Sequence, residues 1–381
     1  MTSREKFLAV VDFDTSVPVP DWEFAFWHDT IERWYTEGLP KGNPVIRPEH
    51  QFISAEAMGG VVPDVWAYFP FDEGISTVTV STVPIPAFDR ETISEDDEFI
   101  EFKDAAGKRV KARKDGRSMP AFLEFPVRSV GDFEEYSRRF DPASKDRFHP
   151  KWAGFLKSWS RRTNPLQLGG GNFCGFFSIL RELMGLEGAL FLFYDDPKLA
   201  HRILSFFTEF YIDVYSEVLA QTDVDYVLIW EDMCYKNGPL ISPDCFVEFI
   251  SPCYVRLIDA LHHLGAKNAF VDTDGNCEAL IPLFMKAGVN GLYPFEAQAG
   301  MDIERIRSLY PGLVIMGGVD KMALAAGKDA IDLELKKVRR MLSSGGFIPY
   351  TDHAVPPDVD FSNYRYFRRG LRDIISSVAG D

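Results

Sequence analysis

The sequence predicts an α/β protein, a (β/α)8 barrel of the TIM type with an N-terminal helical extension and a β-hairpin insertion. From Leu166 onward, short apolar runs alternate with longer amphipathic stretches, which is the pattern of repeated βα units around a parallel sheet. The length of 381 residues suits one large barrel or two domains. Counting earlier strand-like segments brings the number of expected strands to eight, the number that closes such a barrel.

The expected strands lie mainly in the second half of the chain. Six are expected there, over Leu166–Gly169, Tyr226–Trp230, Ala269–Asp272, Gly291–Tyr293, Leu313–Met316 and Phe347–Tyr350. The other two are expected over Ser76–Val83 and Gln51–Ala55. An open doubly wound sheet is the alternative, because periodicity does not reveal whether a sheet closes.

The helices are expected between these strands. The longest runs from Pro197 to Gln221, where apolar residues recur at helical spacing. Shorter helices are expected to begin at Pro243, Cys277, Asp302, Asp329 and Ser362.

Residues 1–381 are expected to form a single barrel domain, with the extension, the insertion and the first strands inside 1–165. The run from Asp21 to Tyr35 is aromatic and reads as an amphipathic helix. Residues 97–114 alternate polar and apolar positions around Ala105-Ala106-Gly107, which predicts a β-hairpin.

Composition limits the partners of the protein. There are 41 Lys and Arg against 57 Asp and Glu, a net charge of −16. Binding to nucleic acid or to an anionic membrane surface needs a basic surface, so neither is expected. No apolar run approaches the roughly 20 residues of a spanning helix. Five cysteines without CxxC spacing read as reduced thiols, so the expected location is the cytoplasm.

Acidic residues follow several of the expected strands, where the catalytic groups of a (β/α)8 barrel lie. The expected catalytic residues are Glu231, Asp272 and His353. With Asp274 they offer oxygen and nitrogen ligands from three strands, which suits a catalytic zinc, because neighbouring carboxylates repel unless they share protons or bind a cation. A metal-free carboxylate site is the alternative. The expected substrate-binding residues are Phe173, Phe177, Trp230, Asp274 and Tyr293.

Two motifs carry a family resemblance. Thr351-Asp352-His353-Ala354-Val355-Pro356-Pro357, followed by Asn363-Tyr364 and preceded by Trp230-Glu231-Asp232, resembles the uroporphyrinogen decarboxylase superfamily. The opening Arg4-Glu5-Lys6-Phe7-Leu8-Ala9-Val10 is also similar to the start of these proteins. The resemblance implies a (β/α)8 barrel, in agreement with the strand count.

Two branches of that superfamily compete. The resemblance implies that true decarboxylases hold the substrate carboxylates with an arginine-rich N-terminal segment, whereas residues 17–24 here contain no arginine. In the corrinoid-dependent methyltransferases, zinc is held by a His-x-Cys pair and a distant cysteine. Asp272-Thr273-Asp274 and His353 stand at those places here. Such harder ligands would suit a metal that polarises an ether or hydroxyl oxygen.

The leading hypothesis is therefore a methyltransferase-like enzyme that moves a methyl group between a small methylated substrate and the corrinoid (methylcobalamin) of a partner protein, assisted by zinc. A metal-free decarboxylase or lyase acting on a small carboxylic acid is the second hypothesis. A non-catalytic binding barrel is the third. The decarboxylases of the family tend to dimerise, which makes a homodimer a further expectation.

Overall fold

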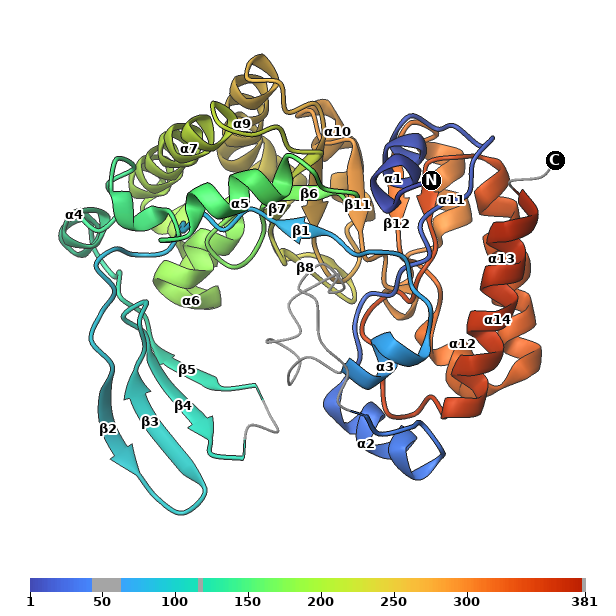
Figure 1. Ribbon diagram of the computed structural model, residues 1–381. Coiled ribbons are helices and arrows are strands. Elements are labelled where there is room, and N and C mark those ends of the chain that lie inside the picture. Colours follow the sequence, from blue (N-terminus) through green and yellow to red (C-terminus); the bar gives the residue numbers. More distant parts are fainter. Residues whose placement is uncertain (43–62, 116–118, 379–381) are drawn as a thin grey trace.

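A curled parallel sheet of seven strands organises the chain (Figure 1). The computed structural model describes residues 1–42, 63–115 and 119–378. The strand order is β1-β6-β7-β10-β11-β12-β13, so each strand lies beside the next one along the chain. The strands are β1 (Ser76–Thr77), β6 (Leu166–Gly169), β7 (Tyr226–Trp230), β10 (Ala269–Asp272), β11 (Gly291–Tyr293), β12 (Val314–Met316) and β13 (Phe347–Ile348).

The six strands predicted in the second half of the chain are confirmed, with small differences at two of them. β12 begins one residue late, and β13 ends at Ile348 rather than at Tyr350. β1 is shorter than the predicted run over 76–83. The strand predicted over Gln51–Ala55 lies outside the described residues, and an eighth strand of the sheet is not seen among the residues that are described.

Helices follow the strands and cover the outside of the sheet (Figure 1). The longest, α7, spans Pro197–Leu219, close to the prediction. The other helices after β6 are α6 (Phe176–Asp195), α8 (Pro243–Cys245), α9 (Ser251–His263), α10 (Ile281–Lys286), α11 (Ile303–Leu309), α12 (Lys321–Ala326), α13 (Lys328–Ser343) and α14 (Phe361–Val378). Short 3-10 turns span Lys145–Arg147, Glu278–Leu280 and Ala297–Ala299, and a π-helical turn spans Phe246–Ile250.

Side chains of the strands alternate between two cores. One alternate set packs inside the curl of the sheet, and the other packs against the helices. The inner set is Tyr226, Leu228, Phe270, Tyr293, Val314, Met316, Ile348 and Tyr350. The outer set is Leu166, Leu168, Val227, Ile229, Val271, Leu292, Ile315 and Phe347. Because side chains alternate along a strand, a residue at a strand end faces the same side of the sheet as the residue two positions before it.

The helix predicted from Asp21 begins late. Residues 21–25 have no regular secondary structure, Phe26 forms an isolated parallel bridge with Val355, and α2 spans His28–Thr36. Residues 21–26 are hydrogen-bonded to segments just before β1 and after β13: the Asp72 amide donates to the Asp21 carbonyl at 3.0 Å, and the Val355 amide donates to the Ala25 carbonyl at 2.9 Å. These tertiary hydrogen bonds outweigh the helical spacing of the aromatic residues.

The remaining elements before β6 are α1 (Ser3–Val11), α3 (Pro63–Tyr68), α4 (Val130–Ser137), α5 (Trp152–Trp159) and the strands of a four-stranded antiparallel sheet. These strands are β2 (Glu91–Glu95), β3 (Phe99–Lys103), β4 (Arg109–Arg113) and β5 (Ala121–Glu124). Figure 1 shows this sheet projecting from the body of the molecule. A small ribbon, β8 (Cys234–Tyr235) with β9 (Gly238–Pro239), follows β7.

Two further findings about the described part of the chain concern its cysteines and its helices. All five cysteines are buried free thiols. Of the helices described, none has the length and apolar character needed to cross a membrane.

Candidate functional site

Trp230, Asp272 and Tyr293 form a row across the carboxyl ends of three neighbouring strands. Asp272 is paired with Trp230 on β7 and with Tyr293 on β11 in the register of the parallel sheet. Asp272 also shares the parity of Phe270, which packs inside the curl. The three side chains therefore lie on the inner side of the sheet, at the end where barrel enzymes carry out their chemistry.

Asp272 is a carboxylic acid in an apolar setting. The residue is 8% exposed, and the described residues donate no hydrogen bond to its side chain and form no ion pair with it. Burial raises its pKa well above the ordinary value, and the negative charges of Asp274 and Asp232 act in the same direction. Burial and these two neighbouring acids therefore disfavour the ionised form of Asp272 more than at an ordinary aspartate.

Asp274 and His353 form the second part of the site. His353 Nε2 lies 3.6 Å from Asp274 Oδ2, and the His353 ring centre lies 5.0 Å from that of Phe24. Burial lowers the pKa of His353, but the contact with Asp274 and the charges of Asp274 and Glu296 outweigh burial, so the pKa is raised. The structure thus brings together two of the predicted site residues from the ends of different strands.

Glu231 lies on the other side of the sheet. Its carboxylate accepts hydrogen bonds from the amides of Phe176, Phe177 and Ser178 at 2.7–3.1 Å and from the Tyr254 hydroxyl at 2.6 Å. Burial raises its pKa, although these four hydrogen bonds act to lower it. Glu231 therefore holds the first turn of α6, and the prediction that it acts in the pocket with Asp272 does not match this geometry. Its parity with Ile229, an outer-core residue, is the signal that could have placed it.

The predicted zinc ligands do not form a common set. The part of the chain that the structure describes contains no group of three or more His, Cys, Asp or Glu side chains arranged to hold a metal ion. Glu231 is directed into α6, which leaves Asp272 beside the Asp274–His353 pair. As the structure places them, the four residues do not fit one zinc site.

Phe173 and Phe177 were predicted to contact substrate, but they lie in the outer core between the sheet and the helices. Phe177 is fully buried, and Phe173 packs on Phe140 with ring centres 6.4 Å apart. Of the predicted substrate-binding residues, Trp230, Asp274 and Tyr293 lie at the carboxyl ends of the strands.

Sequence reasoning missed Glu23. This fully buried carboxylate accepts hydrogen bonds from the Thr351 amide at 2.9 Å, the Thr351 hydroxyl at 2.6 Å and the Tyr364 hydroxyl at 2.8 Å. It therefore fixes the turn that carries His353, and the next residue, Phe24, packs on the His353 ring. The sequence signal for Glu23 was its place within residues 17–24, the segment in which the family resemblance implies substrate-binding arginines.

A second missed contact fixes the other side of the same turn. Asp352, fully buried, accepts hydrogen bonds from the amides of Ala297 at 2.8 Å and Lys321 at 3.1 Å. Lys321 Nζ lies 3.3 Å from Asp352 and 3.6 Å from Glu296. The carboxylate of Asp352 is thereby used within the protein, and His353 is held from both sides.

A cleft of about 490 Å³ opens beside Asp274. Its charged lining residues are Arg181, Asp232, Lys236, Asp274 and Glu296. Arg181 donates to the side chain of Asp232 at 2.8 Å, and Asp232 has a φ of 48°, a strained value of a kind found at functional sites. The volume is in the range of small-molecule sites.

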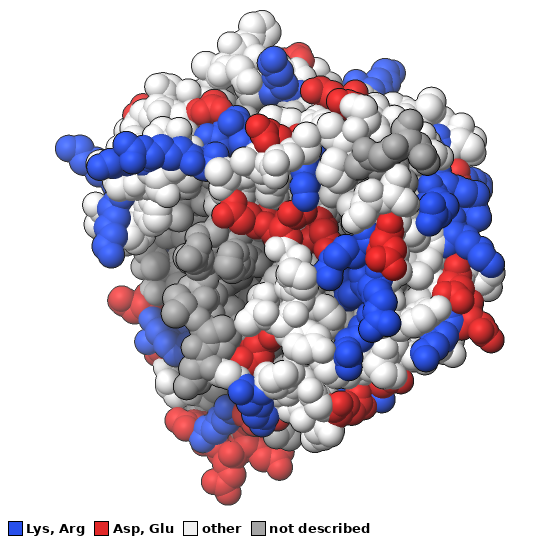
Figure 2. Space-filling view, turned by 45° about the vertical axis from the view of Figure 1, so that its right-hand side comes forward, with Lys and Arg blue, Asp and Glu red and all other residues white. Residues whose placement is uncertain are grey.

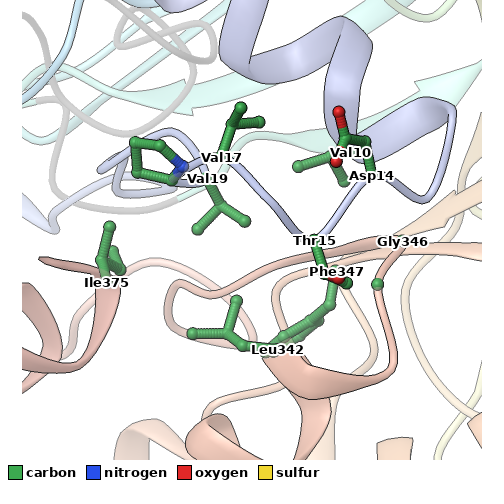
Figure 3. Close-up of a pocket in the computed structure, with 11 residues that line it drawn as sticks. Val10, Asp14, Thr15, Val17, Val19, Leu342, Gly346, Phe347 and Ile375 are labelled. Atoms are coloured by element: carbon green, nitrogen blue, oxygen red, sulfur yellow. The ribbon is translucent and has the colours of Figure 1, made fainter. Parts of the chain in front are cut away.

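Surface charge is mixed on the face of the molecule shown in Figure 2, where acidic and basic side chains are interspersed. Another cavity, between the N-terminal segment and the residues around Phe347, has only about 10 Å³, which is room for one water molecule, and mainly aliphatic side chains line it (Figure 3).

Residues 103–373 match the family model described as uroporphyrinogen decarboxylase (URO-D). The chain belongs to this family. Among solved structures, a methyltransferase from Methanosarcina mazei is similar over 99% of both chains, with a TM-score of 0.58 and 14% identity. At that identity the similarity establishes the fold.

A B12-independent methionine synthase from Shewanella sp. W3-18-1 is similar over 59% of this chain and 66% of its own, with a TM-score of 0.36 and 15% identity. That similarity is too low to support an argument. No curated protein shows a significant sequence match.

Proposed function

We propose that this protein is a methyltransferase that moves a methyl group between a small methylated substrate and the corrinoid of a partner protein. The observation that carries the proposal is the inner row of Trp230, Asp272 and Tyr293 beside the Asp274–His353 pair. The fold shared over the full length with a methyltransferase supports it. The partner's cobalt would supply the chemistry of accepting or donating the methyl group.

Decarboxylation of a tetrapyrrole polycarboxylate is the less favoured reading of the family membership. Residues 17–24 contain no arginine, and the segment presents Phe24 to His353. Arg181 lines the cleft, but Asp232 already accepts its hydrogen bonds. Recognition of many carboxylates needs guanidinium groups that the substrate can reach.

Roles for the residues follow from their positions. Trp230 and Tyr293 would enclose the methyl-bearing group beside Asp272, and the Asp274–His353 pair would hold or release a proton at His353 Nε2. Glu231 would act only by holding α6. No step is assigned to zinc, because the four predicted ligands do not form one set.

The test is transfer of a methyl group to reduced free cobalamin, followed by the absorbance change on formation of methylcobalamin. A panel of methylated ammonium compounds and methyl ethers serves as donors. We expect transfer from at least one donor with wild-type protein and a loss of at least about tenfold with Asp272→Ala, but no loss with the surface variant Asp213→Asn. The absence of transfer from every donor contradicts the proposal.

A metal-free decarboxylase or lyase acting on a small carboxylic acid is the second candidate. One observation favours it: the pKa of Asp272 is raised and His353 lies beside Asp274, so two titratable groups are available to donate and accept protons without a metal. This candidate predicts release of carbon dioxide from a small acid, with the same rate after treatment with a strong chelator.

A further inference from the structure

We infer that the row of Trp230, Asp272 and Tyr293 binds an organic cation, a methylated ammonium group whose charge is balanced by Asp272 and whose methyl groups contact the two rings. The inference rests on the proposed function, in that it takes this row as the substrate site and names the substrate class. A neutral methyl ether is the competing class.

Among the described residues, Asp272 has no hydrogen-bond or ion-pair partner for its side chain. The residue is more than nine-tenths buried and faces the inner side of the sheet, and the described residues give its carboxyl group neither a hydrogen bond nor an ion pair. A buried carboxyl group without partners is costly, so such groups are usually paired. A bound ligand with a positive charge would supply the missing partner.

Three basic residues near the carboxyl ends of the strands lie beside other acids. Arg181 pairs with Asp232 at 2.8 Å, and Lys321 pairs with Asp352 at 3.3 Å. His353 lies beside Asp274. None of the three forms an ion pair with Asp272 in the described part of the chain, so the charge of an ionised Asp272 is left for a ligand.

Aromatic rings flank Asp272 on both neighbouring strands. Trp230 and Tyr293 are its register partners, and Trp230 is only half-buried. Tyr226 and Tyr350, which also face the inside of the sheet, are close enough for the charge of Asp272 to act on their hydroxyl groups. The faces of tryptophan and tyrosine rings attract ammonium groups, and rings arranged around a cation recognise quaternary ammonium ligands.

The same neighbours argue against a metal ion. A metal site needs three or more nitrogen, oxygen or sulfur donors directed to one point, and the described residues contain no such group of His, Cys, Asp and Glu side chains. One carboxylate between two rings suits a large, weakly hydrated organic cation instead.

The test compares two ligands of the same shape, choline and its uncharged carbon analogue 3,3-dimethylbutan-1-ol, by isothermal titration calorimetry and tryptophan fluorescence at neutral pH. With wild-type protein we expect choline to bind at least about tenfold more tightly than the alcohol. Asp272→Asn should abolish this preference, whereas the matched surface change Asp213→Asn should keep it. Trp230→Leu should weaken choline binding about tenfold and supplies a second variant if Asp272→Asn does not fold.

Three results overturn the inference: equal binding of the two ligands, a preference for choline that persists in Asp272→Asn, or no binding of either ligand. Failure of the proposed function is distinguishable, because these titrations need no corrinoid. A protein that prefers choline but transfers no methyl group refutes the proposed function alone. Transfer from neutral ethers without a preference for choline refutes the inference alone.

Discussion

Glu231 and Asp272 lie beside each other on neighbouring strands, yet their carboxyl groups lie on opposite sides of the sheet. The Glu231 amide donates to the Asp272 carbonyl at 2.9 Å. The Glu231 carboxylate accepts hydrogen bonds from the start of α6, whereas Asp272 lies on the inner side with Phe270. The sequence predicts that both acidic residues act at the same end of the barrel. The structure instead gives Glu231 a role in holding α6 and leaves Asp272 on the inner side of the sheet.

The first prediction concerns Glu231. Replacement by alanine leaves three buried amides of α6 and the Tyr254 hydroxyl without their acceptor, so Glu231→Ala should lower the free energy of unfolding by about 3 kcal/mol or more. Tyr254→Phe removes one of these hydrogen bonds and should cost about 1 kcal/mol. Urea denaturation measures both. A Glu231→Ala protein as stable as wild type would contradict the structural role.

The strands of the second half were predictable because apolar runs of four or five residues are separated by helical patterns of a different period. The same alternation places Trp230 and Glu231 on opposite sides of the sheet, so the sequence contains the signal that separates Glu231 from Asp272. The contact of Glu23 with Thr351 joins residues 328 positions apart, and no local pattern in the sequence specifies it. The non-helical course of residues 21–27 likewise depends on hydrogen bonds to Asp72 and Val355, which are distant in the sequence.

The second prediction concerns the pH dependence of stability at Asp272. Burial, with Asp274 and Asp232, raises the folded-state pKa above the unfolded value of about 3.9, so the folded state binds more protons than the unfolded state. The contribution of Asp272 to stability is therefore lost as pH rises from the unfolded pKa toward the folded pKa. Asp272→Asn removes this loss.

We accordingly expect Asp272→Asn to be more stable than wild type at pH 7, with the difference shrinking toward pH 4. Thermal denaturation of the two proteins across this range measures it, and Asp213→Asn is the control. A variant that is less stable than wild type at pH 7 would show that the Asp272 carboxyl group has a stabilising partner.

The third prediction concerns zinc. Because the described residues contain no group of three or more potential ligands, we expect well below one equivalent of zinc in protein purified without chelators or a histidine tag. Elemental analysis of wild type and His353→Ala should give the same low value. About one equivalent in wild type and none in the variant would restore the zinc site expected from the sequence.

The fourth prediction separates the opposing influences on His353. Burial lowers its pKa, and the contact and charge of Asp274, with the charge of Glu296, raise it above the ordinary value. Asp274→Asn removes the two contributions of Asp274, so burial should then dominate and the pKa should fall below that of an ordinary histidine.

Proton NMR titration of the His353 ring, assigned by comparison with His353→Ala, measures this shift. In wild type the His353–Asp274 pair contributes stability that is present below the unfolded histidine pKa and lost as pH rises through the raised folded value. Asp274→Asn should therefore lose more stability at pH 5 than at pH 9, and an equal loss at both would mean that Asp274 does not act through the charge of His353.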